Sequence, residues 1–175
     1  MKSQLLIKYE DIISLENLFA AWQEFSTGKK KKPDVKGFGT FLTNNILQLH
    51  GELANFTYVH GDYEAFNISD PKPRNIHKAT VRDRVLHHAI YRKLYPFFDR
   101  VFIDGSYSCR NDKGTHKALN HFRKSYLQVS KNNTKTVWIL KCDIKKFFAS
   151  IDHSILLEIL ASYIPDKDIL LSLIH

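Results

Sequence analysis

One acidic side chain follows a short apolar run and is the first candidate for chemistry in this sequence. Val137 to Leu140 form the run, and Asp143 comes soon after it among charged and aromatic residues. Such a run is typical of a strand that is covered on both faces, so the carboxylate is expected where the strand leaves the sheet. Mg²⁺ prefers hard oxygen ligands. Asp143 is therefore a candidate metal ligand.

The surrounding segment, residues 138–153, resembles motif A of reverse transcriptases. In that motif an Asp binds the catalytic magnesium ions, and an aromatic residue five positions later screens the sugar of the incoming nucleotide. The resemblance implies that Asp143 is catalytic, that Asp143 and Ile144 contact the metal, and that Phe148 contacts the deoxynucleotide. The implied chemistry is phosphoryl transfer, in which two divalent ions activate the attacking hydroxyl and stabilise the leaving oxygen. The simpler interpretation is a solvated Asp143 beside two core residues, Phe147 and Phe148.

A polar loop upstream, from Gly105 to Leu119, resembles a second block of bacterial reverse transcriptases. There a Ser/aromatic/Arg turn precedes a short helix start that contains His. Arg and Lys side chains in such a loop are suited to meet phosphate. The resemblance implies that Arg110, Lys113 and His116 contact nucleic acid. The simpler interpretation is an exposed loop with a glycine before a helix.

A third block, Pro71 to Ile90, is a basic stretch that leads into a helix. Thr80 and Asp83 form a variant capping box, and apolar residues then recur at helical spacing until the helix ends before Pro96. The block resembles the part of the reverse transcriptase fingers that grips the incoming triphosphate. The implied contacts are Arg74 first, because its planar fork can bond two phosphate oxygens, with Lys72 and Arg82 behind it. Solvated charges on an exposed β-segment are the simpler interpretation.

Three blocks in the family's order imply the N-terminal portion of an RNA-directed DNA polymerase of the group II intron, retron or diversity-generating retroelement kind. The implied fold is α+β (mixed α/β) and helix-rich, with the fingers and an incomplete palm of a right-hand polymerase. Its expected divisions are 1–53, a helical N-terminal extension, 54–135, the fingers region, and 136–175, the start of the palm. The implied partners are RNA template, RNA/DNA hybrid and dNTP, with Mg²⁺ as cofactor and Mn²⁺ as the alternative ion.

The sequence departs from this family in one important feature. Reverse transcriptases carry Tyr-x-Asp-Asp on a hairpin after motif A, and that tetrapeptide is absent here. The nearest acidic group, Asp166-Lys167-Asp168, follows Pro165 and is typical of a turn and helix cap. Because the chain stops at His175 inside the apolar run Ile169 to Ile174, we expect a truncated polymerase that is inactive alone. Uncovered palm surface is expected to cause self-association, which light scattering would detect.

Several helices and one hairpin are expected to position these residues. Ser14 should cap a helix that ends at Gly28. A second helix is expected over about Lys36–Leu49, with Phe41 inward and Gly51 breaking it. Strands at Phe56–His60 and Tyr63–Ile68 should form a hairpin around Gly61-Asp62. Further elements are expected at Thr115–Val129 (helix), Ser130–Lys135 (loop) and from Asp152 or Ser154 (helix).

Composition limits the function further. With 26 Lys and Arg against 18 Asp and Glu, the formal charge of +8 favours a polyanionic partner. The chain contains no apolar run long enough to span a membrane and no signal-peptide pattern, so a cytoplasmic location is expected. Two cysteines are too few for a disulfide framework, and Cys142 is expected to be a buried free thiol.

Two other functions remain open. One is a non-catalytic RNA-binding module or a remnant of a reverse transcriptase, which salt-sensitive RNA binding unaffected by Asp143→Ala would favour. The other is a palm-type nucleotidyl cyclase. It needs a glycine-rich acidic hairpin, which is absent from this sequence.

Overall fold

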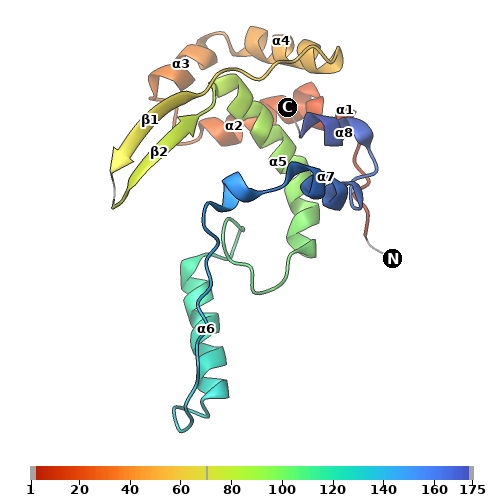
Figure 1. Cartoon of the computed structure of the whole chain (residues 1–175). Coiled ribbons are helices and arrows are strands. Elements are labelled where there is room, and N and C mark those ends of the chain that lie inside the picture. Colours follow the sequence, from red (N-terminus) through yellow and green to blue (C-terminus); the bar gives the residue numbers. More distant parts are fainter. Residues whose placement is uncertain (1–2, 70, 174–175) are drawn as a thin grey trace. The chain divides into compact units, whose positions relative to one another are not determined.

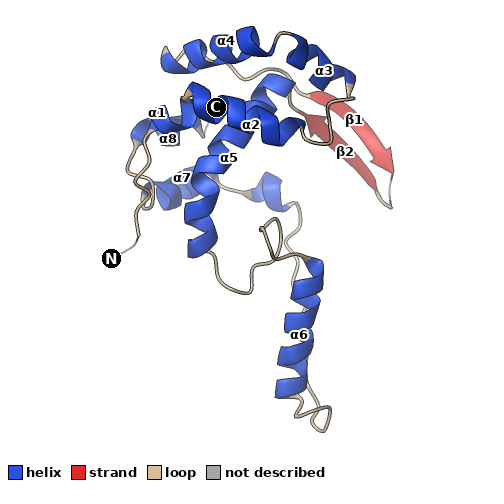
Figure 2. Cartoon of the chain, turned by 180° about the vertical axis from the view of Figure 1, so that it is seen from behind, coloured by secondary structure: helices blue, strands red, loops and turns tan. Residues whose placement is uncertain are grey.

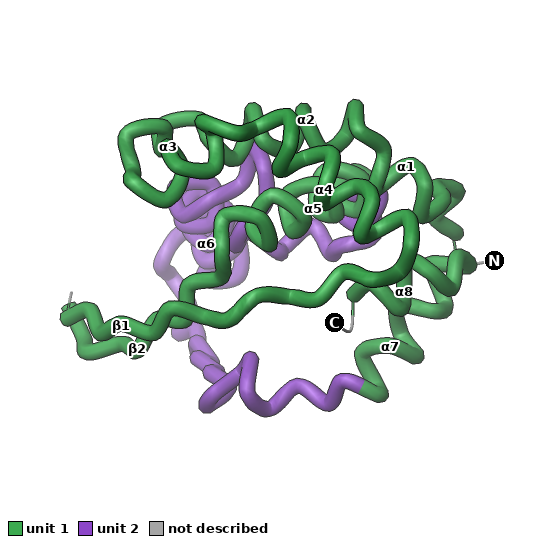
Figure 3. The backbone as a smooth tube through the Cα atoms, turned by 90° about the horizontal axis from the view of Figure 1, so that it is seen from above, with its two compact units in different colours: residues 1–96, 154–175 green, residues 97–153 purple. Residues whose placement is uncertain are grey.

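The computed structural model describes residues 3–69 and 71–173 and shows the helix-rich α+β class predicted from the sequence (Figures 1 and 2). Two compact units are present, residues 1–96 with 154–175 (unit 1) and residues 97–153 (unit 2), as Figure 3 shows. The expected division into extension, fingers and palm stays a prediction. The elements in chain order are α1 (Tyr9–Ile13), α2 (Leu15–Ser26), α3 (Pro33–Thr40), α4 (Leu42–Ala54), β1 (Glu64–Ser69), β2 (Pro73–Lys78), α5 (Val81–Val101), α6 (Thr115–Val129), the 3₁₀ helix η1 (Phe147–Ser150), α7 (His153–Ala161) and α8 (Lys167–Ser172).

Unit 1 has an apolar core between its helices. The prediction for α2 is confirmed at both ends, since the Ser14 side chain accepts a hydrogen bond from the Asn17 N–H and Gly28 adopts a positive φ after the helix. The Asn17 side chain is buried and donates to the carbonyl oxygens of Ile12 and Ala89. This amide ties α1, α2 and α5 together while satisfying its own donors. The fully buried apolar side chains of unit 1 include Ile12, Leu18, Ile46, Leu49 and Val85.

The second predicted helix is wrong in its extent, because two helices occupy this stretch. Pro33 begins α3, in agreement with the preference of proline for the first helical position. Phe41 leaves the helical conformation at the junction with α4, and its side chain is 65% exposed and not inward. Gly51 lies inside α4 and does not break it.

The predicted hairpin is also wrong, because β1 pairs antiparallel with the basic segment β2 and not with Phe56–His60. Residues 57–63 form no strand. The cause is a tertiary contact: Asp83 at the start of α5 accepts hydrogen bonds from the Gly61 N–H and from the Tyr58 hydroxyl. Pro73 opens β2 at a strand's first residue, where a missing N–H is tolerated.

Helix α5 begins as predicted but ends later. The Thr80 hydroxyl accepts a bond from the Asp83 N–H and donates to the Asp83 carboxylate, which is the expected capping pair. The predicted end before Pro96 is wrong, because Pro96 lies inside the helix. A proline removes only its own N–H bond, and the last turn still closes through the Phe102 N–H and the Phe98 carbonyl.

Unit 2 contains α6, which has the predicted bounds, and the predicted loop after it. The strand predicted before Asp143 is absent: residues 136–144 are extended without strand pairing in the described structure and run back alongside α6 (Figures 1 and 2). Trp138 and Leu140 are 92% and 88% exposed. Cys142 is likewise exposed, so the prediction of a buried thiol is wrong. A strand forms only where a neighbouring strand pairs with its backbone N–H and C=O groups, and a local sequence pattern does not reveal whether such a neighbour is present.

The C-terminal helices pack with the N-terminal segment inside unit 1. The predicted cap at Asp166 is confirmed, since its carboxylate accepts bonds from the Asp168 and Ile169 N–H groups at 2.9 and 3.1 Å. It also accepts one from the Tyr9 N–H at 2.9 Å. Ile174, the last apolar residue of the predicted run, lies outside the described residues. No helix in the described stretches has both the length and the apolar character to cross a bilayer.

Candidate active-site segment and nucleic-acid contacts

Asp143 and Ile144 lie in the extended segment of unit 2, and both side chains are exposed. After them Lys146 takes a left-handed backbone conformation, which turns the chain into η1. One turn of η1 is closed by the Ser150 N–H, which donates to the Lys146 carbonyl at 3.0 Å. The local fold therefore leaves the Asp143 carboxylate open to solvent and free of internal packing.

Phe147 and Phe148 meet edge to face, with ring centroids 5.2 Å apart and an interplanar angle of 71°. Phe148 is 83% exposed and Phe147 is half exposed. The simpler interpretation requires both rings to be buried in the core, but neither ring is buried in the described structure. An exposed ring five positions after the acid remains available to contact a sugar.

The residues present fit only part of a magnesium site. Asp143 offers one carboxylate, and Ile144 can offer only its backbone carbonyl. Two-metal phosphoryl transfer needs ligands enough to hold both ions close together. Among residues 3–69 and 71–173, no cluster of three or more His, Cys, Asp or Glu side chains is placed to bind a metal. No catalytic step follows from the described residues alone.

The triphosphate candidates lie in unit 1 and differ in their surroundings. Lys72 is exposed in the turn of the β1–β2 hairpin. Arg74 is exposed on β2 opposite Ile68, on the same face as Phe66. Arg82 instead pairs with Glu52, and its guanidinium lies 4.8 Å from the centre of the Tyr58 ring. Arg74 and Lys72 are accessible to an anion, whereas Arg82 is engaged inside unit 1.

The candidates before α6 divide in the same way. The Arg110 side chain is only 8% exposed, and it bonds Asp99 through both the carboxylate and the carbonyl at 2.7 Å. It also donates to the carbonyls of Ile103 and Ser106. Lys113 pairs with the Asp104 carboxylate at 2.7 Å. His116 is exposed on the first turn of α6. Arg110 therefore holds the turn 99–113 together in this structure.

Arg110→Ala should loosen this turn. The carbonyls of Asp99, Ile103 and Ser106 would lose their donor, at a local cost of about 2 to 3 kcal/mol. Amide hydrogen exchange across residues 102–114 is the measurement, and the expected result is faster exchange there. Lys117→Ala, at an exposed cation of the same unit, is the control and should leave the exchange of this turn unchanged. Equal exchange in wild type and Arg110→Ala would contradict the structural role.

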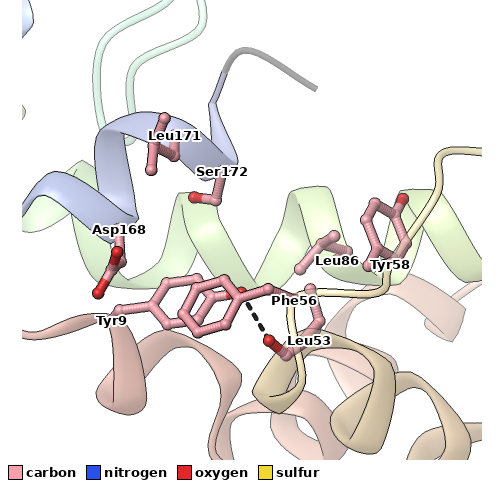
Figure 4. Close-up of a pocket in the computed structure, with 8 residues that line it drawn as sticks. All are labelled: Tyr9, Leu53, Phe56, Tyr58, Leu86, Asp168, Leu171 and Ser172. Carbon is pink, nitrogen blue, oxygen red and sulfur yellow. Dashed lines mark hydrogen bonds between the residues drawn. The ribbon is translucent and has the colours of Figure 1, made fainter.

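A cavity of about 240 Å³ lies in unit 1, and no local sequence pattern indicated it (Figure 4). Tyr9 and Phe56 stack along one side with ring centroids 5.5 Å apart, and the Tyr9 hydroxyl donates to the Leu53 carbonyl. Burial raises the pKa of Tyr9, and the nearby Asp168 carboxylate adds to this effect. The lining has one carboxylate and no Lys, Arg or His, so the cavity is unsuited to a triphosphate. Its lining comes from separate segments of the chain: Tyr9, Leu53, Phe56, Tyr58, Leu86, Asp168, Leu171 and Ser172.

The structure thus leaves six of the nine predicted site residues with exposed side chains and engages Arg82, Arg110 and Lys113 in internal pairs. Of the exposed ones, unit 2 contains Asp143, Ile144, Phe148 and His116, and unit 1 contains Lys72 and Arg74. Comparison with models of known protein families found no match, and comparison with curated proteins found none either.

Proposed function

We propose that this chain is the N-terminal fingers and partial-palm portion of an RNA-directed DNA polymerase. It would bind an RNA template and an incoming dNTP, and Asp143 would be one of the ligands of Mg²⁺. The observation that supports this proposal most directly is the exposure of the segment from Val137 to Phe148. Its first residues have the composition of a strand covered on both faces, yet Trp138 and Leu140 are exposed. Their exposure supports a role in a palm whose other strands cover them.

The β1–β2 hairpin supports the same proposal from unit 1. It extends away from the helices of its unit and carries Lys72 and Arg74 on exposed positions (Figures 1 and 2). Arg74 takes part in no ion pair within the described part of the chain, so its guanidinium can meet phosphate. Such a hairpin suits the fingers element that grips a triphosphate.

The proposal includes three consequences for the protein in solution. With Asp143 as the single candidate carboxylate, the chain should not polymerise DNA by itself. Exposed Trp138, Leu140 and Ile144 favour self-association through the uncovered surface, and a concentration-independent monomer mass in light scattering would count against it. A cytoplasmic location is part of the proposal because RNA and dNTP are both available there.

The DNA that follows the His175 codon tests the polymerase proposal directly. Translation should give, in frame, a Tyr-x-Asp-Asp tetrapeptide between apolar strand-like segments. That motif would supply the further metal-binding carboxylates that are needed beside Asp143. A stop codon with no such motif in any frame would remove the reason to place metal at Asp143.

The alternative function is a non-catalytic RNA-binding module, favoured by the charge of +8 and by the exposed basic residues of α6. In that case RNA binding should be salt-sensitive and indifferent to Asp143→Ala. The downstream sequence separates the two hypotheses, because a binding module needs no Tyr-x-Asp-Asp.

A further inference from the structure

The positive charge of this protein is concentrated in one stretch, residues 113–142, called the basic arm here. It includes α6, the loop after it and the extended segment that runs back alongside α6 (Figure 1). No Asp or Glu occurs in this stretch, which therefore holds most of the formal charge of +8. Its cations are Lys113, Lys117, Arg123, Lys124, Lys131, Lys135 and Lys141.

Helix α6 separates its polar and apolar side chains onto opposite faces. Lys117, Asn120 and Lys124 follow one another at spacings of three and four residues and so share a face. The apolar side chains of Leu119 and Phe122 lie on the other side of the helix. Lys117 and Lys124 are two turns apart, about 10.5 Å along the helix axis.

The polar face of α6 borders a groove of about 420 Å³ in unit 2. The turn before α6 forms the other side through Tyr107 and Lys113, and the Tyr107 hydroxyl contacts the His121 ring. Two acids, Asp104 and Asp112, also line the groove, and Asp104 is paired with Lys113. The groove thus combines Lys117 and Lys124, which are in no ion pair of the described residues, with neutral hydrogen-bonding side chains and with Asp112.

Apart from Lys113, the cations of the basic arm have no internal partner acid among the described residues, whereas several arginines of unit 1 do. In unit 1, Arg82, Arg84 and Arg92 pair with Glu52, Asp34 and Glu24. In the described part of unit 2, the ion pairs involve Arg110 and Lys113. None of the remaining cations of the basic arm takes part in one. Lysines and arginines that are exposed and unpaired can neutralise an external polyanion without breaking an internal bond.

We propose that the basic arm binds the phosphate backbone of RNA, either single-stranded or in an RNA/DNA hybrid, along the polar face of α6. The identity of this nucleic acid rests on the proposed polymerase function. Recognition is of the backbone and independent of sequence, since the arm offers charges to phosphate. A basic amphipathic helix can also lie on an anionic membrane. RNA is favoured because Asn120, His121 and Tyr107 place hydrogen-bonding groups among the lysines.

The test compares two variants of the full chain with equal loss of charge. Lys117→Gln/Lys124→Gln neutralises the polar face of α6, and Lys31→Gln/Lys32→Gln neutralises part of the basic loop of unit 1. Binding of a short fluorescein-labelled RNA is followed by fluorescence anisotropy over a range of salt concentrations. For single strands the logarithm of the binding constant falls by about 0.7 per contacted phosphate and unit of log salt, so the α6 variant should lower this slope by about 1.4. The loop variant should keep the wild-type slope.

Each outcome bears on the proposal, provided that circular dichroism shows wild-type helicity in both variants. Equal loss in the two variants would show a general charge effect and overturn the assignment to α6. An α6 variant that keeps the RNA slope but loses binding to vesicles of phosphatidylserine and phosphatidylcholine would assign the arm to lipid and overturn the RNA proposal. A wild-type chain that binds no RNA would overturn this inference whatever sequence follows His175. A missing Tyr-x-Asp-Asp with a normal α6 effect would instead refute only the polymerase.

Discussion

Asp83→Ala is expected to lower the free energy of unfolding of unit 1 by about 3 kcal/mol or more. The Asp83 side chain is 1% exposed and accepts hydrogen bonds from the Tyr58 hydroxyl at 2.7 Å, the Thr80 hydroxyl at 2.5 Å and the Gly61 N–H at 3.2 Å. Alanine would leave these donors without their acceptor and would release the segment around Gly61 from α5. Urea denaturation followed by circular dichroism measures the loss.

Two further variants make this result specific. Asp62→Ala removes the same charge from an exposed neighbour of the same segment and should change the unfolding free energy by less than about 0.5 kcal/mol. Asp83→Asn keeps the size of the side chain but loses the negative charge, and it should fall between wild type and Asp83→Ala. Equal unfolding midpoints for Asp62→Ala and Asp83→Ala would contradict the anchoring role.

Lowering the pH should weaken the same hydrogen bonds around Asp83 and so destabilise unit 1. Burial by itself raises the pKa of Asp83, but the hydrogen bonds from Thr80 and Tyr58 outweigh it and hold the pKa below its ordinary value. A carboxyl with a depressed folded pKa contributes stability that is present above about pH 4 and is lost as the pH falls further. His87 affects stability at a higher pH than Asp83 does. Burial lowers the pKa of His87, so protonation below about pH 6.5 favours the unfolded state. Thermal melts over this range should fall in two stages, and Asp83→Asn should weaken the lower one. Part of the lower stage should remain, because hydrogen bonds from Lys78 and Arg84 also hold the pKa of Asp34 below its ordinary value.

The elements that the sequence predicted correctly are those with local signals at both ends. Helix α2 has the Ser14 cap and Gly28, and α6 lies between Gly114 and the loop at Ser130. The failures are elements that depend on distant partners. The segment near Gly61 alternates like a strand, but the Asp83 carboxylate binds it to α5. Local alternation cannot reveal that competing contact.

The candidate site follows the same division. Exposure of Arg74 on a basic β-segment could be expected from its neighbours in the sequence. The hydrogen bonds of Arg110 to Asp99 and to backbone carbonyls could not be expected from the sequence, because a turn brings those acceptors around the guanidinium. The basic arm is visible in the sequence as a stretch without Asp or Glu. The lack of ion pairs at its cations other than Lys113 could not be expected, because a partner acid can come from any part of the fold.

The second large effect is expected at Asp143. The purified 175-residue chain should give no extension of a DNA primer on an RNA template with Mg²⁺, because one exposed carboxylate cannot hold two ions. A polypeptide that continues through the proposed downstream Tyr-x-Asp-Asp should extend the primer. In that longer polypeptide Asp143→Asn should reduce the rate by about 10³-fold or more, which corresponds to about 4 kcal/mol of lost transition-state stabilisation. Primer extension resolved on a denaturing gel measures both results.

A matched variant and a binding assay separate catalysis from folding in this experiment. Asp62→Asn changes an exposed acid that belongs to none of the assigned contacts and should leave the rate within about twofold of wild type, since a surface substitution outside the site has little effect. Anisotropy with labelled RNA should give the same affinity for Asp143→Asn as for wild type, because the phosphate contacts are assigned to α6. Primer extension by the 175-residue chain itself would refute the proposal that Asp143 lacks its partners. An active Asp143→Asn in the longer polypeptide would remove Asp143 from the metal site, even if RNA binding and the role of α6 remained intact.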